Sequence, residues 1–410
     1  MIIIYNVTKI QPNEPKSAKW IHSALPAILL HGAIGSVYSF SLFVKPISEH
    51  IGKSTQSVQF AFSLAIFFLG MSAAFAGGMV EKNIKKSSLL STILFCSGLI
   101  VTGIAVNIKS LVLLYIGYGF LGGCGIGLGY VSPVKTLMLW FKDNKGLATG
   151  ISVCAFGFAS TVASPIITYL TAHYSLQMTF TILACIYVIP MTAAHFLLRK
   201  PLNWHEPTVN INYNVKAVIK DKKFQYIWLI FFINITCGLA VISIASPMLS
   251  EFGKSPVAIA MIVGIMGLFN GAGRLVLSAL SDKLKDRSKM YDIILGVSAV
   301  IVIGAEVLLL LAHNTILAVI ALMLISAFYG AGFSCLPTLL SDIFGMKNIS
   351  KIHSLELTAW SMAGLIGNQI SETLHNITGT YSYTFVVTAI LYLFAWLIIK
   401  KKLDKCLVNV

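Results

Sequence analysis

The residue with the clearest chemical potential is Arg274, which lies in a long apolar stretch of the chain. It stands eight residues before Asp282, the acid that we place at the membrane surface. At about 1.5 Å of helix rise per residue, this puts Arg274 about 12 Å deep. A guanidinium at that depth is costly unless it faces a polar cavity or a partner. Its planar fork suits bidentate binding of a carboxylate, and Asn270, one turn earlier on the same face, adds an amide donor.

Two interpretations of Arg274 are open from these residues: a binding site for an anion, or a permanent ion pair with a buried acid. Glu306 and Glu356 are the only other acids that we place inside spans, and both are expected near span ends. Glu306 could be a protonatable coupling group, but a solvated acid at the outer end fits the same position. We expect Lys135 to reach the inner interface by extending its side chain. His31 could shuttle protons near neutral pH, but a hydrogen-bonded core histidine fits the same position.

Aromatic side chains recur inside the same apolar stretches. One at a time, such residues are most often packing or interface residues. A ring of them around a single cation would instead form an apolar, shape-selective box that excludes water and strengthens the ion pair. The residues considered for such a box are Tyr38, Tyr130, Tyr329, Phe333 and Trp360.

The composition excludes several classes of protein. A formal charge of +15 alone would suggest nucleic-acid binding, but 57% of the residues are hydrophobic, so the basic residues are interpreted as loop anchors beside anionic lipid. No G-x-S-x-G, HExxH or Walker A motif occurs. The seven cysteines show no CxxC pair, so neither disulfides nor structural zinc is expected. We therefore predict no enzyme activity, no metal site, no cofactor and no nucleic-acid partner.

Twelve apolar stretches are each long enough to cross a hydrocarbon core about 30 Å thick. They should be helices, because alternating barrel strands are not seen and lipid offers no other way to satisfy the backbone. The predicted spans are near 20–43, 57–78, 88–107, 110–137, 147–170, 175–198, 223–249, 256–282, 290–312, 315–340, 354–375 and 380–400.

Positive charge sorts to one side of these spans. With both termini cytoplasmic, only Lys45, Lys53, Lys109 and Lys254 of the 30 Lys and Arg residues face outward, and Lys135 and Arg274 lie within spans. Because positive charge is retained in the cytoplasm, we predict a multi-pass protein of the plasma or inner membrane with both termini inside.

The chain divides into two similar halves. We predict a six-helix half over residues 1–198, a cytoplasmic central loop over 199–223 and a second six-helix half over 224–410. Weak internal repeats support the duplication. The matched pairs are Gly70 with Gly271, Glu81 with Asp282, Lys82 with Lys283, Pro133 with Pro337, Trp140 with Phe344, and Asn144 with Asn348. In the fourth span, Gly119, Gly123 and Gly127 form a predicted face for close helix packing.

These features resemble the major facilitator superfamily, whose signature loop is similar to Ser281-Asp282-Lys283-Leu284-Lys285-Asp286-Arg287. A narrower resemblance is to the oxalate/formate antiporter family, which is related to monocarboxylate transporters. It rests on Gly129-Tyr130-Val131-Ser132-Pro133-Val134 and Lys145-Gly146-Leu147-Ala148-Thr149-Gly150 near the fourth span, Asn270-Gly271-Ala272-Gly273-Arg274 in the eighth, and Asp342-Ile343-Phe344-Gly345 after the tenth.

The resemblance implies that Arg274 binds a substrate carboxylate beside Asn270, within a cavity lined by Tyr38, Tyr130, Tyr329 and Phe333. Oxalate-carrying members have a lysine in the eleventh span, where this chain has Trp360. A dianion would keep an unpaired charge in a low-dielectric site, so a singly charged acid is favoured.

We therefore predict a secondary transporter of a small monocarboxylate such as lactate, pyruvate or formate, working by alternating access. Proton symport and anion exchange are both left open, so the predicted partners are a small organic anion, the lipid bilayer and, for symport, protons. The alternatives are an oxalate or other dicarboxylate antiporter, an exporter of drugs or organic cations, and a membrane receptor that does not transport.

Overall fold

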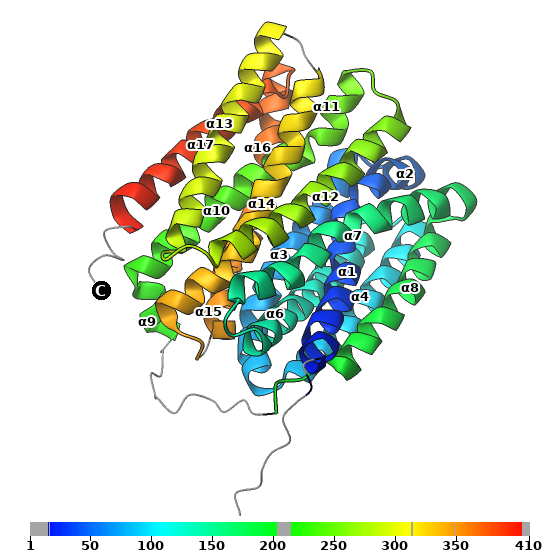
Figure 1. The fold of residues 1–410 in the computed structure, drawn as a ribbon. Coiled ribbons are helices and arrows are strands. Elements are labelled where there is room, and N and C mark those ends of the chain that lie inside the picture. Colours follow the sequence, from blue (N-terminus) through cyan, green and yellow to red (C-terminus); the bar gives the residue numbers. More distant parts are fainter. Residues whose placement is uncertain (1–14, 16, 203–214, 313–314, 348, 404–410) are drawn as a thin grey trace, which may run out of the picture.

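The protein is a bundle of long helices, seen in a computed structural model that describes residue 15 and residues 17–202, 215–312, 315–347 and 349–403 (Figure 1). Every regular element in these residues is helical. In the first half the elements are η1 (Trp20–Ala24), α1 (Leu25–Ile34), η2 (Gly35–Ser39), α2 (Ser41–Ile51), α3 (Thr55–Lys82), α4 (Ile84–Asn107), α5 (Leu111–Leu114), η3 (Tyr115–Gly122), α6 (Gly123–Trp140), α7 (Lys145–His173) and α8 (Leu176–Leu197).

The second half repeats this pattern. Its elements are α9 (Val215–Lys220), α10 (Lys222–Ser243), α11 (Ala245–Glu251), α12 (Pro256–Ser281), α13 (Ser288–Ala312), α14 (Thr315–Phe344), α15 (Ile349–Glu356), α16 (Thr358–Thr378), α17 (Ser382–Ile398) and η4 (Ile399–Leu403). Many helices begin at a polar cap: the side chains of Ser54, Asn83 and Ser255 accept backbone N–H groups at the starts of α3, α4 and α12.

Eleven segments of the described chain are long and apolar enough to cross a membrane. The remaining predicted span, near 354–375, corresponds to α15 and α16, which pack against α3 and α10 inside the bundle. This helix is interrupted at Leu357 and carries the buried polar residues His353, Glu356 and Ser371. The predicted all-α integral membrane fold with twelve spanning helices is confirmed, and the eleventh span is more polar than the others.

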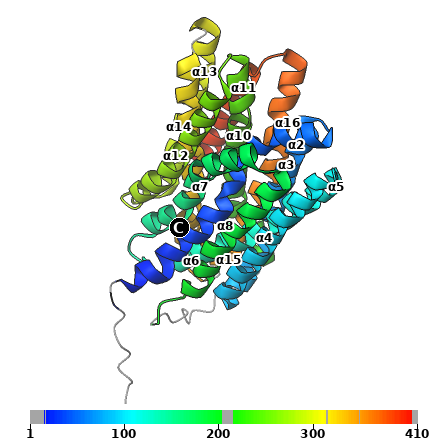
Figure 2. The same cartoon turned by 90° about the vertical axis from the view of Figure 1, so that its right-hand side faces the viewer.

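Helices of one half lie beside those of the other along two seams (Figure 1). Helix α7 packs along α12, and α3 packs along α15 and α16. In the turned view, α1, α8 and α4 of the first half lie side by side (Figure 2). Residues 203–214 of the predicted central loop lie outside the described residues, so the predicted domain limits 1–198, 199–223 and 224–410 stay predictions.

Glycines let several of these helices approach closely. A Cβ on Gly157 of α7 would lie 2.7 Å from the backbone nitrogen of Gly271 on α12, so this seam is a backbone-to-backbone contact. On η3 and α6, Gly119, Gly123 and Gly127 all face α3. The predicted packing face of the fourth span is therefore confirmed.

Candidate functional site

Arg274 projects from α12 into the interior, and its side chain is fully buried. Its Nε donates a hydrogen bond of 2.7 Å to Oδ1 of Asn270, one turn earlier on the same helix. Within the described part of the chain, Nη1 and Nη2 have no hydrogen-bond partner. Leaving a buried donor unsatisfied costs about 1–3 kcal/mol, and more when the group is charged. The outer edge of the guanidinium therefore presents two N–H donors in a geometry that suits an acceptor with two oxygens.

Two aromatic rings flank this guanidinium. Its Cζ lies 4.8 Å from the ring centroid of Phe333 on α14 and 5.5 Å from that of Phe156 on α7. Ring faces attract a cation but do not neutralise it. Because α7 belongs to the first half and α14 to the second, the charge is held where the two halves meet.

The remaining aromatic residues extend this cluster. Trp360 of α16 lies against Phe333, with 4.4 Å between ring centroids, and against Tyr130 of α6 at 5.4 Å. The hydroxyls of Tyr38 on η2 and Tyr329 on α14 are 3.0 Å apart and join the halves by a hydrogen bond. The hydroxyl of Tyr130 and Nε1 of Trp360 are buried without a partner, so the box offers polar groups as well as apolar walls.

All seven candidate residues are brought to one place by the fold. Arg274, Asn270, Tyr329, Phe333 and Trp360 come from the second half, and Tyr38 and Tyr130 come from the first. Phe156 was not predicted, although its ring contacts the rings of Tyr38, Tyr130 and Trp360. No motif marks it out, because a phenylalanine in an apolar span has the same sequence signature as a packing residue.

The acids do not pair with Arg274. Among the described residues, no acidic side chain forms an ion pair with it. Glu306 is only 8% exposed, so its expected solvation was wrong. Glu356 is fully buried, with most of the α15–α16 helix beyond it, and so lies deeper than expected.

His31 is a buried, hydrogen-bonded histidine, as one of its two interpretations predicted. Its Nδ1 faces the carbonyl oxygen of Ser152, and its Nε2 lies 3.1 Å from that of Tyr130. The ring also stacks on Tyr130, with 5.1 Å between centroids. His31 therefore ties the wall of the aromatic box to α1 and α7.

One end of the bundle is closed by a contact between the halves, at the junction of the α12 C-terminus and the α7 N-terminus. The carboxylate of Asp282 accepts hydrogen bonds from the backbone nitrogens of Gly146 and Leu147, at 2.8 and 2.9 Å. An anion at a helix N-terminus is stabilised by the helix dipole and the free N–H groups. We name this contact the Asp282 latch.

Arg287 supports the Asp282 latch. It donates to Asp282 over 2.9 Å and also bonds Asp342. Partial burial acts against its charge, but the hydrogen bonds to Asp282 and Asp342 raise the pKa of Arg287 above its usual value. The guanidinium therefore stays charged and holds Asp282 in place.

A second closure lies at the same end, where α3 meets α15. Glu81 accepts a hydrogen bond of 3.0 Å from the backbone nitrogen of Ser350 near the start of α15. Its other oxygen is paired with Lys135 of α6, which is only 4% exposed. We name this contact the Glu81 latch. Lys135 was expected to extend its side chain to the inner interface; its side chain is buried and paired with Glu81 of α3.

The two latches occupy equivalent places in the internal repeat. Glu81 ends the second span of the first half, and Asp282 ends the second span of the second half. Each carboxylate caps a helix that belongs to the opposite half. The weak sequence match between these residues thus reflects a shared structural role.

Two packed halves, a buried cation between them and paired latches at one end define a membrane transporter. Comparison with known proteins agrees. The pattern of the Major Facilitator Superfamily matches residues 24–305 and, in an overlapping match, 227–404. The chain belongs to the Major Facilitator Superfamily and is a transporter of that superfamily.

Similar proteins span nearly the whole chain. The oxalate:formate antiporter of Oxalobacter formigenes is 24% identical over 91% of this chain and 88% of its own. Monocarboxylate transporter 12-B of Danio rerio is 22% identical over 85% of this chain and 79% of its own. The solved proton:xylose symporter XylE superposes with a TM-score of 0.75 at 15% identity, covering 94% of this chain and 95% of that one. At that identity, the superposition shows the fold alone.

Proposed function

We propose that this protein is a secondary transporter of a small monocarboxylate, of the lactate, pyruvate or formate type, in the plasma or inner membrane with both termini cytoplasmic. The observation that carries the proposal is the buried guanidinium of Arg274, whose two terminal nitrogens have no hydrogen-bond partner among the residues that the structure describes. A carboxylate satisfies both nitrogens at once and neutralises the charge. The names of two similar proteins, an oxalate:formate antiporter and a monocarboxylate transporter, support the same substrate class.

The roles of the other residues follow from their contacts. Asn270 accepts from Nε of Arg274 and so fixes the direction of the guanidinium fork. Tyr38, Tyr130, Tyr329, Phe333, Trp360 and Phe156 limit the size of the substrate and exclude water, which strengthens the ion pair. The halves would rock about this site and expose it to one side of the membrane and then the other, with the two latches closed in the state described.

The charge of the site favours a monoanion. Arg274 is the only Lys or Arg among the residues that form the aromatic box, and Trp360 stands where a second cation would serve a dianion. A second carboxylate would keep its charge in a low-dielectric environment, at a cost of several kcal/mol. For the same reason, the unpaired guanidinium disfavours an organic cation as substrate.

Uptake into proteoliposomes tests this proposal. Wild-type protein should exchange at least one of labelled formate, lactate and pyruvate in a saturable way. Arg274→Ala should abolish the exchange, and Arg274→Lys should reduce it more than tenfold, because a point charge replaces the bidentate fork. A size-exclusion profile equal to wild type shows that each variant is folded. Saturable exchange at the wild-type rate in both variants would refute the assignment.

A further inference from the structure

Glu356 is a buried carboxyl group that the substrate site does not use. It is the last residue of α15, where the helix is interrupted before α16, and it is 0% exposed. Neither of its oxygens has a hydrogen-bond partner, and no ion pair of the described residues includes it. An ionised carboxylate in such surroundings is strongly penalised, whereas a protonated one is neutral.

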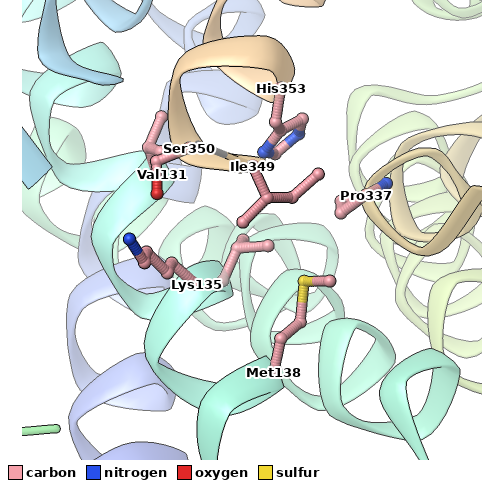
Figure 3. A pocket seen from close by; sticks show the side chains of 8 residues that line it. Val131, Lys135, Met138, Pro337, Ile349, Ser350 and His353 are labelled. Atoms are coloured by element: carbon pink, nitrogen blue, oxygen red, sulfur yellow. The ribbon is translucent and has the colours of Figure 1, made fainter. Parts of the chain in front are cut away.

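His353 lies one turn before Glu356 on the same face of α15. It is 2% exposed, and its Nε2 has no partner. Its ring is one wall of a small hollow between α6, α14 and α15, near the Glu81 latch (Figure 3). The hollow is lined by Val131, Val134, Lys135, Met138, Pro337, Ile349, Ser350 and His353. His353 therefore stands between Glu356 and the end of the bundle that the latches close.

The same helix face continues to the substrate site. Trp360 is one turn beyond Glu356, and its ring packs on Phe333 and Phe156, the two rings that flank Arg274. The ring of His353 also lies 6.2 Å from that of Tyr130. Glu356 thus lies in the chain between His353, which lines the hollow, and Trp360, which packs in the aromatic box, at the break between α15 and α16.

Most of the charged and titratable groups on the other helices have partners of their own. Glu81 of α3 and Lys135 of α6 pair with each other, and Tyr291 of α13 donates to the carbonyl oxygen of Gly332. On α14, Tyr329 is bonded to Tyr38, and the thiol of Cys335 is buried. Cys237 of α10 donates to Thr388, and His375 of α16 bonds Glu251 at the far end. Arg274 of α12 and His31 of α1 bond Asn270 and backbone carbonyls.

We propose that Glu356 is a proton-binding site that makes this protein a proton–monocarboxylate symporter, with His353 linking it to the hollow. The inference rests on the proposed function and extends it. Closing the bundle buries two ionisable sites, Arg274 and Glu356. Their summed charge is zero when the carboxylate and the proton are both bound, and also when both are absent. If only one of them is bound, the closed protein carries a net buried charge, which is costly. The carrier therefore closes with both ligands or with neither.

This charge balance predicts an unusual behaviour for Glu356→Gln. The glutamine imitates the protonated carboxyl, so the substrate-loaded carrier is neutral and still closes. In the empty carrier, no negative charge compensates Arg274. The empty carrier therefore cannot close, and it cannot move its site back to the other side of the membrane. The variant should therefore exchange substrate across the membrane at close to the wild-type rate but lose net uptake driven by a pH gradient.

The experiment uses proteoliposomes with labelled formate, lactate and pyruvate, and with pyranine inside to report protons. Wild-type protein under a gradient of one pH unit should accumulate substrate up to about tenfold and acidify the lumen. Glu356→Gln should abolish accumulation and acidification while keeping exchange, and His353→Gln should slow accumulation without affecting exchange. Glu306→Gln is the matched control, because Glu306 is the other buried acid within the spans, and it should behave as wild type.

Several results would overturn the inference. These are gradient-driven accumulation by Glu356→Gln equal to wild type, loss of accumulation in Glu306→Gln instead, or loss of exchange in folded Glu356→Gln protein. The wild type gives a test that needs no variant: carboxylate uptake without proton entry contradicts symport. If the wild type exchanges none of the three acids, the proposed function fails; if it exchanges them but moves no protons, only this inference fails.

Discussion

Replacing Asp282 with alanine should weaken the closure of the latched end of the bundle. Its carboxylate accepts two backbone N–H groups from the start of α7 and one N–H from Arg287. Hydrogen bonds to a charged group contribute about 1.5–3 kcal/mol each. The freed groups regain water when the end opens, so we expect about 2–4 kcal/mol of the closing free energy to be lost. At about 1.4 kcal/mol per factor of ten, the closed-to-open ratio should fall by about 30-fold to 1,000-fold.

Alkylation of one introduced cysteine measures this change. Val134 is 1% exposed and lines the hollow beside the Glu81 latch, at the end of the bundle that both latches close. Val134→Cys, in a protein whose seven native cysteines are replaced, should therefore react slowly with a maleimide. Adding Asp282→Ala should raise the rate at least tenfold.

Asp292→Ala is the matched control for that measurement. It removes an ion pair of 2.6 Å between Asp292 and Lys400, which joins α13 to η4 within the second half and does not bridge the two halves. We expect no change in the labelling of Val134→Cys. Equal rates in the Asp282 and Asp292 variants would show that the Asp282 carboxylate does not hold the halves together.

Two further predictions concern the seam and the substrate box. Gly157→Ala places a methyl group against the backbone of Gly271 and should reduce transport more than tenfold. Gly32→Ala is its control, because the added methyl group meets nothing within 4 Å, and transport rates should not change. Similar rates in both variants would contradict the argument that α7 and α12 need this close contact. Trp360→Lys adds a second cation to the box and should shift inhibition of labelled formate uptake at least tenfold toward oxalate relative to lactate. Trp360→Leu controls for the lost ring, and an identical shift in both variants would mean that volume, not charge, selects the substrate.

The main elements of the site could be predicted because each leaves a sequence signal that does not depend on packing. An arginine within an apolar span is rare enough to indicate a polar interior. Asn270 follows from helix periodicity, and the aromatic candidates follow from their position inside apolar spans and from the family resemblance. The repeat also carried information, because Glu81 and Asp282 prove to have the same role in opposite halves.

The residues that were missed or misplaced depend on tertiary contacts. Phe156 becomes part of the site only because the α7–α12 seam brings it beside Arg274. Lys135 was expected to extend its side chain to the interface, and its buried pairing with Glu81 depends on the packing of α6 against α3. The depth of Glu356 depends on where its helix starts, and α15 begins at Ile349, several residues before the predicted span at 354.

The reciprocal arrangement of the two latches has a consequence for tolerance of damage. Each half supplies the carboxylate that caps a helix of the other half, so each latch needs residues from both halves. Losing one carboxylate leaves the other latch in place. The variant should therefore still transport its substrate, although this end of the bundle closes less tightly. Only the loss of both Glu81 and Asp282 would leave this end of the protein permanently open. The two contacts are therefore redundant for closure.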